Sequence, residues 1–445
     1  MPAEAPTPAP PASPIPPLPP LAASDISARI KRLWTLILLL VVVVASTGAF
    51  VGFPVSPSLR DAPVVGWFWR LLPGEGLATA PAFQIHSDDL IWMWRFKNLP
   101  RPSLPTRDTE YIKMKYLPGA GTPYDDLSYI HGLDQPALER WVCHFLLKVS
   151  GRMPESLPQK DWDYDRDFNW NVTQGNVAPP DSVRLVRVAN AAFMILAAAC
   201  LFLALARAVS PLAGLVGSLY LVFHPSLIDV MWSIGSDPLL WLCMCAALLC
   251  WTLFEDSRTG LILVSLLGGL AASAKVNGAF IVVGYAVWLA LRRKYLYAVL
   301  AAAIGLLTFI ICNPIVFSRG IFGVPVMLWE FLHWRTVRSS MIAAHYPAFA
   351  EAGRWRVMFY LLGVWWPLLP LLIVSRRLWK LDAPVFWAFT LAVGHLLTVS
   401  APLPRYTIAI QEGLALGLIA AYWPKRPLAW KRLLTFLRPR RQVRR

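Results

Sequence analysis

Charged residues are scarce in this chain. Only 15% of its 445 residues are Asp, Glu, Lys or Arg, whereas 56% are apolar. Soluble domains usually contain about 25% charged residues. The deficit excludes a soluble enzyme of two or three ordinary domains, and it also excludes a disordered or coiled-coil protein. The composition predicts an all-α polytopic membrane protein.

Cysteine patterns that bind metals or form disulfide frameworks are also missing. The chain has six cysteines, and all but Cys143 lie in apolar stretches, where cysteine behaves as a small hydrophobic residue. No CxxC or Cys/His spacing is present. The sequence therefore predicts no metal site, no disulfide framework and no cofactor.

Apolar runs are abundant instead, and ten of them are candidate transmembrane helices. The two beside Lys275 are short, which predicts half-length or tilted helices. We expect residues 1–28 to form a disordered, Pro-rich tail, residues 29–425 the membrane domain, and residues 426–445 a basic tail. The ten predicted spans are 33–53, 183–206, 211–227, 237–254, 261–276, 279–291, 296–316, 357–374, 384–400 and 405–423.

The placement of charge predicts the orientation of these spans. With the N-terminus in the cytoplasm, 20 of the 42 basic residues fall in short cytoplasmic segments, as the positive-inside rule requires. Both termini are then cytoplasmic. The net charge of +16 reflects membrane orientation and does not indicate nucleic-acid binding. Loop 54–182, which holds 16 of the 26 acids, and loop 317–356 lie outside. We expect a bacterial inner membrane, with the chemistry on its external side.

Acidic candidates cluster at this external side. Asp88 and Asp89 adjoin apolar residues in FQIHSDDLIWMW, where partial desolvation suits a carboxylate general base; a solvated turn is the alternative. Asp134 precedes Gln-Pro and an amphipathic stretch, 137–149, that is too short to span the membrane. Asp237 opens the fourth span before a proline, either as a helix cap or as a functional acid.

Basic candidates also lie near this side. Lys275 stands in an apolar stretch before Asn-Gly, which predicts a broken helix; its ammonium needs an anion such as a lipid phosphate, or must reach the interface. Arg405 and Glu412, seven residues apart, share one helix face. Arg335 lies in a predicted surface helix and is suited to a phosphate or to interfacial anchoring.

The order of these residues over 33–425 resembles the GT-C fold glycosyltransferases that use polyprenyl-phosphate sugars. The protein O-mannosyltransferase group and the bacterial aminoarabinose lipid A transferases are the most similar. Three departures stand out: Asp89 where Glu is usual, Gln-Pro-Ala at 135–137 where His-Pro-Pro is usual, and Ala274 where Thr is usual. The resemblance is carried by Asp88-Asp89, Asp134-Gln135-Pro136, Arg184-Leu185 or Arg187, Asp237-Pro238, Lys275, Asn313-Pro314, Trp334-Arg335 and Pro404-Arg405-Tyr406.

The resemblance implies transfer of a sugar from a polyprenyl-phosphate carrier to a hydroxyl acceptor, by a single inverting displacement and without a metal. Lys275, Arg405 and Arg335 would hold the phosphate. Asp88 would be the base, with Asp108 or Glu110 as alternatives. Asp89 and Asp237 would orient the acceptor or tune the base, while Asp134 and Glu412 are further expected substrate contacts.

Two other classes of protein compete with this interpretation. A transporter or lipid flippase would also have ten spans, intramembrane charges and broken helices. Against it, no inverted repeat is visible and the acids gather in one external loop. The second class is a scaffold protein with no active site, which would not explain why the ionisable groups lie on one side of the membrane. The sugar, the acceptor and the carrier length are not indicated by the sequence.

Overall fold

The described part of this computed structural model is entirely helical. It covers residues 23–51, 138–152, 173, 180–224, 235–313, 368–398 and 408–423, and within these ranges twelve α-helices, one 3₁₀ helix and no strand occur. The elements are α1 (Ala23–Val51), α7 (Leu138–Val149), α9 (Pro180–Ala208), α10 (Pro211–Phe223), α12 (Asp237–Leu253), α13 (Arg258–Ala274), η1 (Val276–Gly278), α14 (Ala279–Leu291), α15 (Tyr295–Cys312), α20 (Leu368–Ile373), α21 (Arg376–Trp379), α22 (Ala383–Thr398) and α23 (Ile408–Tyr422). The predicted all-α class is confirmed.

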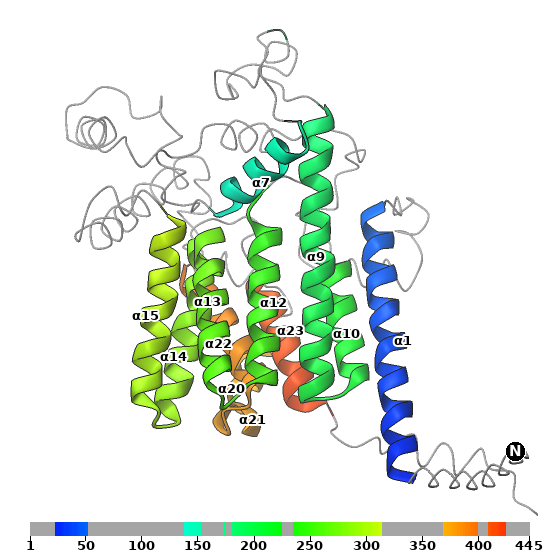
Figure 1. The fold of residues 1–445 in the computed structure, drawn as a ribbon. Coiled ribbons are helices and arrows are strands. Elements are labelled where there is room, and N and C mark those ends of the chain that lie inside the picture. Colours follow the sequence, from blue (N-terminus) through cyan, green and yellow to red (C-terminus); the bar gives the residue numbers. More distant parts are fainter. Residues whose placement is uncertain are drawn as a thin grey trace, which may run out of the picture.

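The long helices stand side by side in a bundle, and α7 lies obliquely across one end of it (Figure 1). We call this the α7 end, and we call the opposite one the far end. Successive helices are joined by short turns at the far end, between α9 and α10, α12 and α13, and α14 and α15. Helix α7 confirms that the amphipathic segment predicted at 137–149 is a separate helix too short to span a bilayer.

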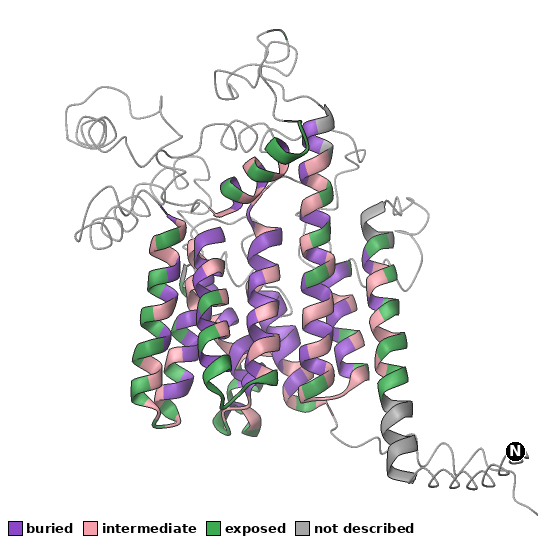
Figure 2. Cartoon of the chain, in the orientation of Figure 1, coloured by how far each residue is buried: buried purple, intermediate pink, exposed green. Residues whose placement is uncertain are grey.

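The outer helices present apolar side chains to the surroundings, as the exposed positions along α1 and α15 show in Figure 2. In α15, Leu296, Val299 and Ile311 are 59–70% exposed. An apolar surface of this extent is what lipid, rather than water, solvates. Two stretches, 185–208 and 295–312, are long and apolar enough to cross a membrane, and seven further apolar helices of the described chain are shorter. The number of ten spans therefore stays a prediction.

The centre of the bundle is α12, which packs between α9 and α13. An aromatic cluster fixes its lower half, where Trp251 meets Tyr285 and Trp288 edge to face, with ring centroids 4.8 and 5.1 Å apart. The indole nitrogen of Trp288 donates a hydrogen bond to the carbonyl of Leu381, at 2.8 Å. This links α14 to the chain that leads into α22. Such packing sets the rotation of α12 and α14, and thus where their polar residues point.

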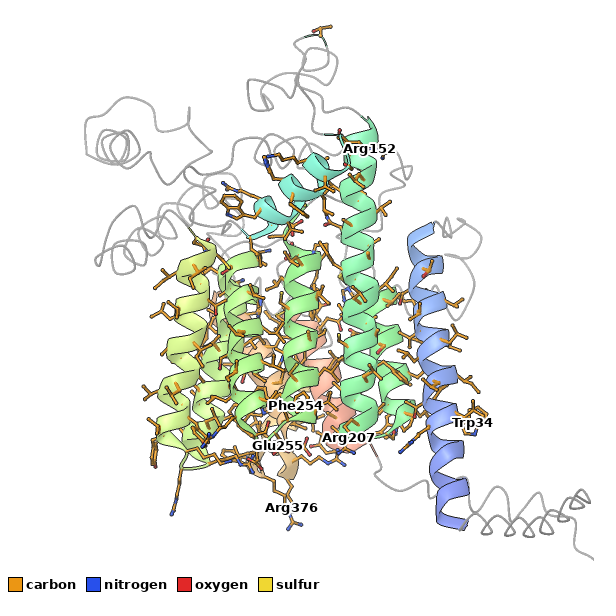
Figure 3. All side chains as sticks on the ribbon, viewed as in Figure 1. Trp34, Arg152, Arg207, Phe254, Glu255 and Arg376 are labelled. Atoms are coloured by element: carbon orange, nitrogen blue, oxygen red, sulfur yellow. The ribbon has the colours of Figure 1, made fainter. Side chains whose placement is uncertain are left out.

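Charged residues border the far end, where Figure 3 labels Arg207, Glu255 and Arg376. The turn after α12 is tied to the turn after α14: Arg292 donates to Glu255 at 2.9 Å, and Lys294 pairs with Asp256. The hydrogen bond from Lys294, together with the charge of Arg292, holds the pKa of Asp256 below its ordinary value. These exposed pairs surround the helix ends with polar groups.

A helix break at Lys275 confirms the interruption predicted from the sequence. Helix α13 ends at Ala274, Lys275 has extended backbone, and the short η1 turns the chain into α14. At Gly278 a Cβ atom would lie 2.2 Å from the backbone carbon of Ala271. Because only glycine permits this approach, η1 can fold tightly against α13 and leave Lys275 at the α7 end.

Candidate functional site

The structure brings together two residues singled out in the sequence, Asp237 and Lys275. The Lys275 ammonium donates a hydrogen bond to Oδ1 of Asp237, 2.7 Å away, although the residues are 38 positions apart. Asp237 is the first residue of α12, and Lys275 follows the last residue of α13. Each charge therefore sits at the helix end whose dipole favours it, a carboxylate at an N-terminus and an ammonium at a C-terminus.

The carboxylate of Asp237 serves this pair rather than a helix cap. Ser236 occupies the N-cap position of α12 and makes no capping side-chain bond. For Lys275 the sequence predicted a lipid phosphate or contact with the interface; the anion found is a protein carboxylate. The side chains of Lys275 and Asp237 are 21% and 32% exposed. A pair exposed to this degree stabilises a fold by roughly 0–1 kcal/mol, so a phosphate group can compete for the ammonium at small cost.

A buried histidine lies within electrostatic range of both charges. His395 of α22 is 4% exposed, and its Nδ1 lies 2.9 Å from the Leu391 carbonyl. The charges of Lys275 and Asp237 both act on the imidazole. Its ring contacts Phe280 of α14, with centroids 5.9 Å apart. The pair is therefore flanked by α22 as well as by the two helices that carry it.

A second carboxyl group, Glu139 of α7, also lies near Asp237. Glu139 is fully buried, and the Cys143 thiol donates a hydrogen bond to its Oε1 at 3.2 Å. Burial raises the pKa of Glu139 to about 8; the bond from Cys143 lowers it, and the charge of Asp237 raises it. Sequence reasoning missed this residue because it treated 137–149 only as a surface helix. The adjacent charged pair Glu139-Arg140 within an apolar helix was the available signal.

Glu412 is buried in a different part of the bundle. It lies on α23 with no exposed surface, and neither carboxylate oxygen has a hydrogen-bond partner among the described residues. Its neighbour Gln411 lies across from α10, where its Oε1 is 2.9 Å from Nε2 of His224. A buried carboxyl group without a partner is much cheaper to keep neutral than charged. The described interactions do not join Glu412 to Asp237 or Lys275.

We expect Glu412→Leu to raise the stability of the protein. Leucine fills a similar volume and removes a buried polar group whose desolvation typically costs about 1–3 kcal/mol. Thermal unfolding in one detergent, compared with wild type and with Leu414→Ala, measures the effect. Leu414→Ala creates a cavity two residues further on and should lower the melting temperature. A lower melting temperature for Glu412→Leu would show that the carboxyl group stabilises the fold.

The remaining predicted site residues lie outside the described part of the chain. These are Asp88, Asp89 and Asp134 of the first loop, Arg335 of the second, and Arg405 before α23. Their predicted roles stay predictions. Of the eight candidates, the structure thus places Asp237 and Lys275 in contact and Glu412 elsewhere in the bundle. It adds Glu139, a buried carboxyl group within electrostatic range of Asp237.

Comparison with known families finds a match in this chain. Residues 141–337 match the family described as dolichyl-phosphate-mannose-protein mannosyltransferase, a family with the GT-C fold. The match contains both Asp237 and Lys275 and most of α7. No curated protein matches the chain at a significant level. Members of the family are membrane-embedded glycosyltransferases that use polyprenyl-phosphate-sugar donors. The resemblance expected from the sequence is therefore confirmed for residues 141–337.

Proposed function

We propose, from the mannosyltransferase-family domain at residues 141–337, that this protein moves a sugar from a polyprenyl-phosphate carrier to a hydroxyl acceptor at the external face of a bacterial inner membrane. The acceptor hydroxyl belongs to a protein, a lipid or a glycan, and the sugar is a hexose or a pentose. The single observation that supports this most is the Lys275–Asp237 pair at the α7 end. It places a partly exposed cation at a helix break, where a lipid-linked phosphate can reach it.

The transfer step follows from the charges involved. The acceptor oxygen attacks the anomeric carbon while the bond from that carbon to the phosphate oxygen breaks. The acceptor proton passes to the carboxylate of Asp88, and the electron pair of the broken bond leaves with the polyprenyl phosphate. Lys275, Arg405 and Arg335 stabilise the negative charge that develops on this phosphate. Fixed charges aimed at developing charge usually contribute more to catalysis than any other single effect.

The other predicted residues have supporting roles. Asp237 keeps the Lys275 ammonium in place until the donor binds, and with Asp89 it orients the acceptor or tunes Asp88. Asp134 contacts the substrate.

The distribution of basic residues supports an external active site. Arg207 lies in the last turn of α9, Arg292 and Lys294 lie in the turn between α14 and α15, and Arg376 begins the short α21. All four are at the far end of the bundle, where Figure 3 labels Arg207 and Arg376. Short segments rich in Lys and Arg stay in the cytoplasm. The far end is then cytoplasmic, and the α7 end, with Asp237 and Lys275, faces outward.

The test is donor turnover by the purified protein in liposomes. Radiolabelled polyprenyl-phosphate mannose and polyprenyl-phosphate aminoarabinose are supplied separately, with extracts of candidate acceptors, and released polyprenyl phosphate is measured. We expect release that depends on both the protein and a hydroxyl acceptor. Movement of a fluorescent lipid-linked sugar between leaflets without release would instead identify a flippase. Neither release nor movement with any donor would contradict the enzyme proposal.

A further inference from the structure

Helix α7 buries the two charged residues of its first turn and exposes several large apolar residues further along, although Lys148 is exposed and Leu147 is buried. Glu139 is fully buried and Arg140 is 5% exposed, whereas Phe145 and Val149 are 64% and 69% exposed. A helix lying on a water-soluble protein shows the reverse pattern. The exposed apolar side chains suit the lipid interface, and the inward charged side meets the end of the bundle. Carboxyl groups are rarely fully buried unless they are paired.

The surroundings of Glu139 connect it to the phosphate site. Its Oε1 accepts from Cys143, its Oε2 has no hydrogen-bond partner in the described part of the chain, and the charge of Asp237 acts on it. Asp237 in turn holds Lys275. The described titratable groups that interact electrostatically with Glu139 are Cys143 on α7 and Asp237 and Cys243 on α12, and Arg140 is next to it in the chain. Helices α9 and α13 also pack against α7; α9 carries Arg187, and Lys275 follows the last residue of α13.

We propose that Glu139 is a positioning residue that sets the net charge of the donor-phosphate site through Asp237 and Lys275. This inference rests on the proposed function. While Glu139 is protonated, Asp237 and Lys275 form a neutral pair, and an incoming phosphate meets a cation balanced by one carboxylate. When Glu139 loses its proton, two carboxylates surround the one ammonium, and their combined charge repels the phosphate.

The direction of the pH dependence follows. Glu139 has a pKa of about 8, so it is protonated at neutral pH and ionised in alkaline solution. A lipid-linked sugar phosphate is a diester that carries one negative charge throughout this range, so the donor itself does not titrate. Donor affinity should therefore be constant at neutral pH and fall as the pH rises through the pKa of Glu139.

The experiment measures the donor KM against pH for wild type, Glu139→Gln and Glu255→Gln in liposomes. Glutamine keeps the shape of the side chain and the acceptor for Cys143, but it cannot ionise. For wild type we expect the donor KM to rise about tenfold between about pH 7 and about pH 9, the ratio expected for one group of pKa near 8. Glu139→Gln should show a flat profile with a KM equal to that of wild type at neutral pH.

Glu255→Gln is the matched control. Its carboxylate lies at the far end in an exposed pair with Arg292, so Glu255→Gln should keep the wild-type dependence of the donor KM on pH.

A substitution at Cys143 should shift the pH at which the donor KM rises, rather than abolish the rise. The hydrogen bond from Cys143 lowers the pKa of Glu139. Cys143→Ala should therefore shift the alkaline rise in KM to higher pH. Cys143→Ser keeps a hydrogen-bond donor and should return the rise to the pH seen for wild type.

The results separate the two hypotheses. If the protein transfers sugar and Glu139→Gln keeps the wild-type rise in KM, Glu139 is only structural and the inference is overturned. If the wild-type protein neither binds nor consumes any donor at any pH, the proposed function itself fails and the inference fails with it. Equal kcat values for wild type and Glu139→Gln at neutral pH, with KM alone depending on pH, are the expected signature of positioning.

Discussion

Lys275→Ala is expected to lower kcat/KM for sugar transfer by about 10²–10³-fold. The reason is that one preorganised donor to developing charge typically contributes about 2.7–4 kcal/mol to the transition state. The substitution removes a cation that the structure holds 2.7 Å from Asp237 at the α7 end. Lys275→Arg keeps the charge but changes its geometry, and it should recover only part of the rate. Initial rates of polyprenyl-phosphate release over a range of donor concentrations measure both variants.

A double variant separates catalysis from folding. Lys275→Ala leaves Asp237 without its cation, so part of any loss could come from destabilisation. The double variant Lys275→Ala/Asp237→Asn removes both charges; we expect its melting temperature to be near that of wild type and its activity to be as low as that of Lys275→Ala. Such non-additivity is typical of groups that act as a unit.

The matched control is Lys294→Ala, which breaks another Lys–Asp pair, that with Asp256 in the exposed turns of the far end. Exposed pairs of this kind contribute little to stability, and this one is remote from the proposed site. Its activity and melting temperature should therefore stay close to those of wild type. Equal activity losses in Lys275→Ala and Lys294→Ala would contradict a specific role for Lys275.

Asp88→Asn is expected to have the other large effect, a fall in kcat of about 10²–10⁴-fold, the usual contribution of one positioned general base. Asparagine has the same size and still accepts a hydrogen bond, but it cannot take the acceptor proton. The donor KM should stay unchanged, because the loss occurs only in the transition state. The decline in wild-type kcat at acid pH, where the base becomes protonated, should be absent from the residual activity of the variant.

Parallel variants decide which acid is the base. Asp108→Asn and Glu110→Gln remove the alternative carboxylates of the same loop, and Asp89→Asn removes the neighbour of Asp88. We expect the kcat of Asp108→Asn and Glu110→Gln to be near that of wild type. The kcat of Asp89→Asn should be intermediate, because Asp89 only orients the acceptor or tunes Asp88. A wild-type rate for Asp88→Asn together with a large loss in Asp108→Asn or Glu110→Gln would move the base to that position.

Much of the fold was predictable because its signals are local in the sequence. Apolar runs of helix length predicted the long helices, and the described helices α9, α12, α14 and α15 begin and end within a few residues of the predicted spans. Asn277-Gly278 after Lys275 predicted the helix break, since polar and glycine residues within an apolar run are typical of a transmembrane helix that is interrupted. The short amphipathic segment at 137–149 likewise predicted α7.

The partners of the charged residues were not predictable in this way. The sequence indicated that Lys275 needs an anion, but Asp237 lies 38 positions away on another helix, and its proline suggested a cap just as well. Glu139 was not predicted as a site residue, because polar residues are expected in a surface helix. Which side of α7 faces inward depends on how it lies across the end of the bundle, and no local pattern specifies that.

The sequence by itself therefore determined an all-helical chain with apolar helices, a break at Lys275 and a resemblance to lipid-linked sugar transferases, because hydropathy, helix breakers and short motifs act over neighbouring residues. Only the tertiary structure decided that Lys275 meets Asp237, that Glu139 is buried within electrostatic range of Asp237, and that Glu412 is buried elsewhere. These contacts depend on which helices pack together and at what rotation. That choice is made by the combined packing of α7, α9, α12 and α13 rather than by any one segment.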